Sequence, residues 1–138
     1  MGGNAFTDTK PITLEEFINL MPVLQIELDI LGASRVIGIG STGKVDVMGD
    51  IDLAVEHPKG RDFLCEHLGK LYGEHSVKKY GSRQLSVRYP NIDDTRYVQL
   101  DMIVGPPGSS GWLWWAHYSP GMAPIKGRAS GIWALRGW

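Results

Sequence analysis

The spacing of apolar side chains divides the chain into helices and strands. From Thr13 onward they recur every three or four residues, which predicts an amphipathic helix that ends near Gly32. Thr13 and Glu16 form a capping box, because a hydroxyl N-cap is followed three residues later by a glutamate. Pro22 lies inside this helix and predicts a kink or a break. A second amphipathic helix is predicted over 61–72, with an inward face made of Phe63, Leu64, Leu68 and Leu71.

Short apolar runs bounded by turn residues predict five strands. They cover residues 34–39, 51–56, 75–80, 84–89 and 96–104. The chain has 138 residues, which is enough for one compact domain and too few for a second independent one. We therefore expect a single α/β (α+β) domain over 1–138, built on a mixed β-sheet of about five strands flanked by helices.

Composition and charge limit the class of protein. No run of about 18 apolar residues occurs, so we expect no membrane span and no membrane partner. The first ten residues lack the apolar region of a signal peptide, and Cys65 is the single cysteine. Because one chain cannot then form a disulfide framework, we expect a reducing, cytoplasmic location. The net charge is −1, but the chain beyond position 77 is rich in Lys and Arg, which favours either a solvated face or a polyanionic ligand.

The segment 38–44 fits two glycine-rich phosphate motifs, G-x-G-x-x-G and G-x-x-x-x-G-K. Both motifs require a long helix directly after the glycines. Only residues 41–50 are available for it, and they contain two glycines, two β-branched valines and no apolar stripe. The second motif also requires Ser or Thr after its lysine, where Val45 stands. We therefore expect neither a dinucleotide fold nor a P-loop.

The strand that follows carries paired carboxylates. Because strand side chains alternate, Ile51, Leu53 and Val55 share one face, while Asp50 and Asp52 share the other. Two neighbouring carboxylates repel each other unless a cation lies between them. Oxygen ligands without nearby Cys or His suit magnesium or manganese. The alternative is a solvated edge strand whose acidic residues have no ligand.

Asp101 is the candidate third ligand. It lies in the otherwise apolar strand segment 98–104, where a lone acidic residue is costly without a partner. An EF-hand is excluded, because Ile51 and Leu53 interrupt the alternation of oxygen ligands that its loop needs.

These residues together match a known signature. Ile39-Gly40-Ser41, eight further residues, Asp50-Ile51-Asp52-Leu53 and the later Asp101 resemble the nucleotidyltransferase superfamily typified by DNA polymerase beta. The spacer is about one residue shorter than is usual in that superfamily. The resemblance covers roughly 38–128 and implies a minimal catalytic palm with a short C-terminal stub that contacts the nucleotide.

The resemblance also implies roles for individual residues. Asp50, Asp52 and Asp101 would be the catalytic residues and would hold two Mg²⁺ or Mn²⁺ ions. The segment 117–121 is similar to the turn that contacts the nucleotide sugar and base, although packing against nearby tryptophans explains its tyrosine equally well. The expected nucleotide- and phosphate-binding residues are Gly40, Ser41, Lys44, His117, Tyr118, Ser119, Lys126 and Arg128.

We therefore expect a polymerase-like nucleotidyltransferase that moves a nucleoside monophosphate from a (d)NTP to the 3′-hydroxyl of a nucleic acid. Lys78, Lys79 and Arg83 would lie near a primer or template backbone, or else form a solvated face. The first alternative is a minimal enzyme that modifies a hydroxyl of a protein or small molecule, with or without a partner chain. The second is a catalytically inactive nucleotide-binding module.

Overall fold

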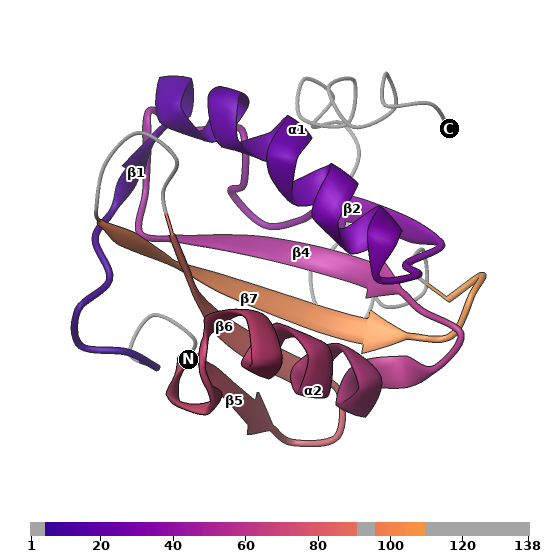
Figure 1. The fold of residues 1–138 in the computed structure, drawn as a ribbon. Coiled ribbons are helices and arrows are strands. Elements are labelled where there is room, and N and C mark those ends of the chain that lie inside the picture. The colour runs from indigo at the N-terminus through magenta and orange to yellow at the C-terminus, as the bar shows by residue number, and fades with distance from the viewer. Residues whose placement is uncertain (1–4, 91–95, 110–138) are drawn as a thin grey trace.

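The protein forms a mixed five-stranded sheet with both of its long helices on one face (Figure 1). The structure is a computed structural model and describes residues 5–90 and 96–109. These residues form β1 (Ile12–Thr13), α1 (Leu14–Ile30), β2 (Arg35–Gly38), β3 (Val47–Met48), β4 (Asp50–Glu56), α2 (Gly60–Tyr72), the 3-10 helix Glu74–Ser76, β5 (Val77–Tyr80), β6 (Gln84–Pro90) and β7 (Tyr97–Gly105). The expected α+β fold class, with a mixed sheet of five strands flanked by helices, is confirmed.

Two neighbouring strands of the large sheet, β4 and β7, come from distant parts of the chain. The strand order is β2-β4-β7-β6-β5, and a separate small sheet pairs β1 with β3. β4 and β7 run parallel, whereas the other three pairs of the large sheet are antiparallel. Helix α2 and the β5–β6 hairpin connect β4 to β7. The connection therefore places a strand from the middle of the chain beside one that follows it much later in the sequence.

The core lies between the sheet and the helices. Ile51, Leu53 and Val55 of β4 are fully buried on the helix side, where they join Phe17 and Leu24 of α1 in one apolar cluster. Because strand side chains alternate, the polar residues of β4 and β7 project from the opposite face. Within the described ranges, no helix combines the length and the hydropathy that crossing a bilayer requires.

The predicted elements agree with the observed ones to within two residues at each end. Two details differ. Helix α1 continues unbroken through Pro22, so the predicted break does not occur. Leu71 is 55% exposed, so its predicted inward orientation is wrong. Leu64, Leu68 and Tyr72 recur every four residues, and Tyr72 rather than Leu71 packs against the core.

Thr13 caps the helix that covers β2 and β4. Its hydroxyl oxygen accepts from the N–H of Glu16 at 3.1 Å, and the Glu16 carboxylate accepts from the N–H of Thr13 at 3.0 Å. We expect Thr13→Ala to lower the free energy of unfolding by about 1 kcal/mol, because both bonds at the helix end are disturbed. Urea denaturation measures the change, with the exposed Thr7→Ala as the matched control. Equal stabilities for the two variants would contradict the capping role.

Candidate metal centre

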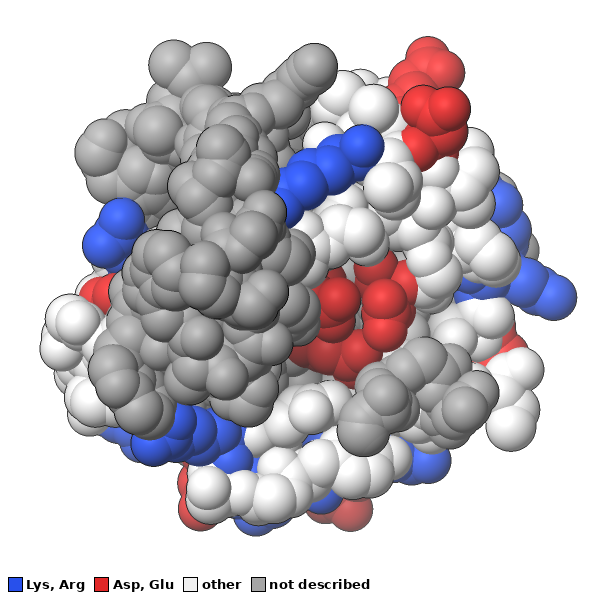
Figure 2. Space-filling model, turned by 180° about the vertical axis from the view of Figure 1, so that it is seen from behind, with Lys and Arg blue, Asp and Glu red and all other residues white. Residues whose placement is uncertain are grey.

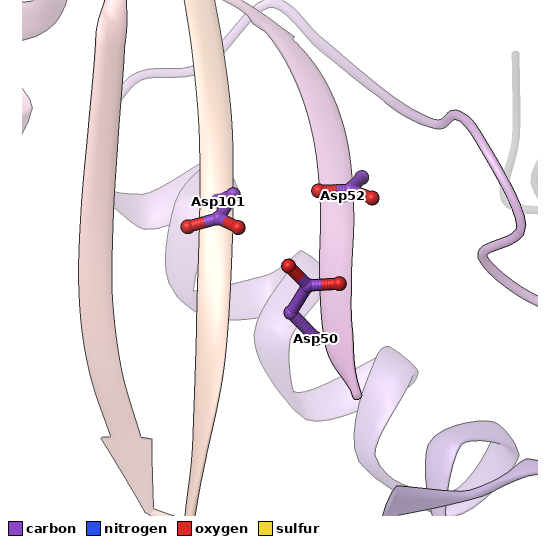
Figure 3. A group of neighbouring side chains, drawn as sticks. All are labelled: Asp50, Asp52 and Asp101. Atoms are coloured by element: carbon purple, nitrogen blue, oxygen red, sulfur yellow. The ribbon is translucent and has the colours of Figure 1, made fainter. Parts of the chain in front are cut away.

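Three aspartates converge on the sheet face that the helices leave open (Figure 3). Asp50 and Asp52 extend from β4, and Asp101 extends from the neighbouring β7. One carboxylate oxygen of each residue lies within 4.8 Å of those of the other two. Figure 2, which views the molecule from the side opposite the helices, shows acidic side chains gathered in a hollow of this face. The structure thus brings together the three residues that the sequence predicts as metal ligands.

The pairing of β4 with β7 produces this convergence. Asp52 lies directly opposite Asp101 in the parallel register. Asp50 lies two residues before Asp52, so its side chain projects from the same face of the sheet. Ile51 and Leu100, which are also opposite each other, are buried on the helix side. A slip of one residue would turn the apolar side chains of a strand toward the open face, so their burial fixes the position of the carboxylates.

Neutral donors orient the deepest of the three carboxylates. Asp101 is only 5% exposed. Its Oδ1 accepts from the hydroxyl of Ser86 at 2.7 Å and from Nε2 of Gln99 at 3.0 Å, while Oδ2 has a longer contact of 3.2 Å to the same Nε2. Ser86 belongs to β6 and lies opposite Asp101 in the sheet. The carboxylate is therefore held from two strands.

Gln99 adds an acceptor to the same site. It lies opposite Asp50 in the register of β4 and β7, and it is fully buried. Its Oε1 atom is buried without a hydrogen-bond partner among the described residues. A buried carbonyl oxygen without a donor is costly. A water molecule held by a cation at the aspartates would provide that donor, so the residues present fit a partly hydrated ion.

Burial and mutual repulsion disfavour the charged forms of the β4 carboxyls. Burial raises the pKa of Asp50 to about 7, with further increases from a hydrogen bond with Asp101 and from repulsion by Asp52 and Asp101. Burial and repulsion by Asp101 raise the pKa of Asp52 to about 6. A divalent cation among the three groups would reverse both effects, because an adjacent positive charge favours the ionised carboxylate. Hard oxygen ligands of this kind suit Mg²⁺ or Mn²⁺.

The turn before β4 is fastened to the backbone of Asp52. The Thr42 hydroxyl accepts from the N–H of Asp52 at 2.8 Å and donates to the carbonyl of Asp52 at 3.1 Å. β2 ends at Gly38, but the N–H of Ile39 still donates to the carbonyl of Asp52 at 3.0 Å, so the Thr42 hydroxyl adds an acceptor for the N–H of Asp52 beside this backbone bond. Gly40 and Gly43 have φ angles of 63° and 78°, a region in which glycine is favoured. The glycines of the motif therefore form a tight turn that positions Asp52, one of the candidate metal ligands.

Fewer backbone N–H groups of this turn are available to bind a phosphate than the sequence predicts. The N–H groups of Thr42, Gly43 and Lys44 already donate to nearby carbonyl and thioether acceptors, at 3.2, 3.3 and 2.9 Å respectively. The N–H groups of Gly40 and Ser41 have no acceptor among the described residues. Ser41 is exposed and Lys44 is half-buried in the turn. A phosphate at this turn would therefore contact the backbone of Gly40 and Ser41, the Ser41 hydroxyl and the Lys44 side chain.

The other predicted contacts fall into two groups. Lys78 donates to the carbonyl of Ala5 at 2.6 Å, and Lys79 pairs with Asp62 of α2 at 3.3 Å. Both cations therefore have partners within the protein, and so does Arg83, which lies in the exposed β5–β6 turn. Five predicted nucleotide contacts lie outside the described residues: His117, Tyr118, Ser119, Lys126 and Arg128.

Sequence reasoning did not identify three supporting residues. Gln99 lies two residues before Asp101, so the alternation of the strand could have placed both side chains on one face. Ser86 and Thr42 gave no such signal, because their roles depend on which strand neighbours Asp101 and on where the turn folds.

No protein-family model matches the chain, and no curated protein matches its sequence significantly. The chemistry that this site can support therefore depends on its own atoms. These are the three carboxylates, the neutral donors that hold Asp101 and the adjoining glycine-rich turn.

Replacing Asp52 with Asn removes one negative charge with little change of shape. Because burial and repulsion disfavour the ionised carboxylates, metal-free Asp52→Asn should unfold at a higher temperature than the wild type at pH 7.5. Mn²⁺ should raise the Tm of the wild type by about 4 °C or more and leave that of the variant nearly unchanged. Scanning calorimetry in EDTA and in Mn²⁺ measures both effects, with Asp62→Asn on α2 as control. Equal Mn²⁺ responses in Asp52→Asn and the wild type would exclude a metal site here.

The stability of the metal-free protein should depend on pH through the same carboxyls. A carboxyl whose pKa is raised on folding binds more protons in the folded than in the unfolded state, here between about pH 4 and pH 7. Lowering the pH through this window therefore increases the contribution of Asp50 and Asp52 to stability, and raising it removes that contribution. Protons compete with Mn²⁺, so the Mn²⁺-induced rise in Tm should be larger at pH 8 than at pH 5. Equal rises at the two pH values would contradict this coupling.

Proposed function

We propose that the protein is a metal-dependent nucleotidyltransferase that moves a nucleoside monophosphate from a (d)NTP to a hydroxyl group. The observation that carries the proposal is the convergence of Asp50, Asp52 and Asp101 beside a Gly-Ser turn. The turn and the aspartates are connected through the backbone of Asp52, so the expected phosphate site adjoins the expected metal site. This arrangement agrees with the resemblance to the superfamily of DNA polymerase beta.

The proposed reaction is an in-line displacement at phosphorus. The acceptor oxygen forms a bond to the α-phosphorus, and the bond from that phosphorus to the pyrophosphate oxygen breaks. Pyrophosphate leaves with the electron pair of the broken bond, and the acceptor hydroxyl gives up its proton. Divalent cations held by the aspartates would neutralise the charge on the phosphates and lower the pKa of the acceptor hydroxyl.

Asp101 is the candidate acceptor of that proton. Ser86 and Gln99 both donate to its Oδ1, so this oxygen is committed to holding the side chain in place. Oδ2 has a longer contact to Gln99, at 3.2 Å, and the hydrogen bond between the Asp50 and Asp101 carboxyls would be lost once a cation keeps both groups ionised, so Asp101 can then take part in proton transfer while it keeps its orientation. A positioned base requires this combination of a fixed group and an available oxygen.

At the nucleotide end, the N–H groups of Gly40 and Ser41 and the Ser41 hydroxyl would donate to the terminal phosphates. Glycine allows the backbone to approach a phosphate closely, and Lys44 would add a positive charge. His117, Tyr118 and Ser119 remain proposed contacts to the sugar and base. Lys126 and Arg128 remain proposed contacts to phosphate.

The acceptor divides the proposal into two candidates. A nucleic-acid 3′-hydroxyl, presented by a primer–template, is supported by the sequence 117–121, which is similar to the nucleotide-contacting turn of polymerases. A hydroxyl of a small molecule or protein is supported by the internal partners of Lys78 and Lys79. Affinity for nucleic acid grows with the number of cationic side chains that reach phosphates. Lys78 and Lys79 already contact groups within the protein, which favours an acceptor other than nucleic acid.

Transfer can be measured with α-³²P-labelled nucleotides, Mg²⁺ or Mn²⁺ and a primer–template. We expect label to move to the acceptor, and we expect Asp101→Asn to lower the rate by on the order of a thousandfold or more, because both metal binding and proton transfer are impaired. Asp62→Asn, an exposed carboxylate on α2, should keep the wild-type rate.

The destination of the label separates the candidates. Extension of the primer supports the polymerase, whereas label on protein or on a small hydroxyl compound supports the second candidate. If calorimetry shows that nucleotide binds but no label reaches any acceptor, the result supports the catalytically inactive binding module. Transfer at the wild-type rate in Asp101→Asn would exclude the three-aspartate mechanism.

A further inference from the structure

Helix α1 carries an exposed apolar ridge on its outer side. Ile18, Val23, Ile26 and Ile30 are 48%, 45%, 54% and 78% exposed. Pro22, which is also exposed, lies between Ile18 and Ile26, so positions 18, 22, 26 and 30 repeat every four residues. Side chains at this spacing form a single ridge along a helix. A contiguous exposed apolar surface of this kind indicates an interaction site.

A groove adjoins one end of this ridge. Its volume is about 480 Å³, and it is lined by Thr13, Leu14, Glu15, Ile18, Asn19 and Asp46. The first turns of α1 form one wall, and the segment before β3 forms the other. A hydrogen bond from the N–H of Leu14 to the carbonyl of Asp46 joins the two walls. The groove is therefore a built feature of the surface, with room for a side chain of another molecule.

We propose that α1 pairs with α1 of a second copy of this chain in an antiparallel homodimer. The groove lies at one end of the ridge, beside Ile18. Ile30, the most exposed large apolar side chain among the described residues, lies at the other end. A twofold axis near position 24 places Ile30 of each copy in the groove beside Ile18 of the other. Ridges of this spacing interdigitate when two helices cross at about −50°.

The polar residues beside the ridge favour the antiparallel arrangement. In this register Asn19 faces Asp29 of the other copy, and an amide can donate to a carboxylate. Glu15 faces Ala33, so carboxylates do not meet along the ridge. A parallel pair would instead place Glu15 against Glu15 and Asp29 against Asp29. Because α1 contains no Lys or Arg to relieve that repulsion, the parallel arrangement is disfavoured.

The dimer interface and the metal centre lie on opposite sides of the sheet. Both helices cover one face, as Figure 1 shows, while the three aspartates project from the other. Pairing through α1 therefore does not involve the face that carries the aspartates. The proposal is independent of the chemistry at the aspartates, and either can fail without the other.

Sedimentation equilibrium of the full chain tests the association. We expect a concentration-dependent mass that approaches twice that of one chain. Ile30→Asp should raise the dissociation constant by on the order of a hundredfold, because it places a carboxylate in a groove that contains Glu15 and Asp46. Leu71→Asp, an equivalent change at an exposed apolar position on α2, should leave the association unchanged. Both positions are exposed, so circular dichroism should show folded variants.

Mixing two variants tests the register. Ile18→Lys and Ile30→Asp should each be monomeric alone, because each substitution places a charge in both of the symmetric contacts. Their mixture should form a heterodimer, in which the introduced lysine of one chain meets the introduced aspartate of the other, and the second contact keeps its native pair, Ile18 and Ile30. A chain that stays monomeric at every concentration would overturn the proposal. The proposal would also be overturned by a dimer that Ile30→Asp does not weaken, by a mixture of the two variants that stays monomeric, or by assembly only with a different protein.

Discussion

The structure depends on holding three carboxylates together against their mutual repulsion. Asp50, Asp52 and Asp101 lie on two parallel strands with oxygens within 4.8 Å of one another, in surroundings that already disfavour charge. Relaxation by strand slippage is blocked, because a shift of one residue would expose Ile51 and Leu53 and bury polar groups in their place. Burial on the helix side of the sheet thus maintains an electrostatically unfavourable arrangement on the open side. Because the fold prevents the carboxylates from separating, this cluster is the candidate cation site on which the proposed function rests.

The residues around the aspartates maintain this arrangement with neutral groups. Ser86 and Gln99 fix the orientation of Asp101, and Thr42 fixes the backbone at Asp52. Such donors position a carboxylate without neutralising it, so its charge stays available to a ligand. The same turn that supplies Thr42 presents Ser41 to solvent, so one candidate metal ligand, Asp52, is joined directly to the expected phosphate contacts. Under the proposed function, this arrangement would supply the positioning and charge neutralisation that phosphoryl transfer needs above all.

The two faces of the sheet serve different purposes. The helix side supplies stability through the apolar cluster, and the open side carries the three carboxylates. Helix α1 belongs to both the core and the surface, since Phe17 and Leu24 pack inward while Ile26 and Ile30 remain exposed on its other side. An apolar surface behind the sheet can engage a second chain without covering the aspartates. The proposed assembly and the proposed catalysis are thereby separated in space within a small domain.

The sequence by itself determined the local features of this protein. Its periodicity predicted both helices and all five strands of the large sheet, and the alternation around Asp50 and Asp52 placed them on one face, because these properties depend on neighbouring residues alone. The lone acid in an apolar strand also marked Asp101. Only the tertiary structure decided that β4 and β7 are parallel neighbours with Asp52 opposite Asp101, that Ser86 and Thr42 hold the site, and that Tyr72 rather than Leu71 packs inward. Alternation tells which face a side chain occupies, whereas strand order and register are fixed by packing between distant segments, which no local pattern encodes.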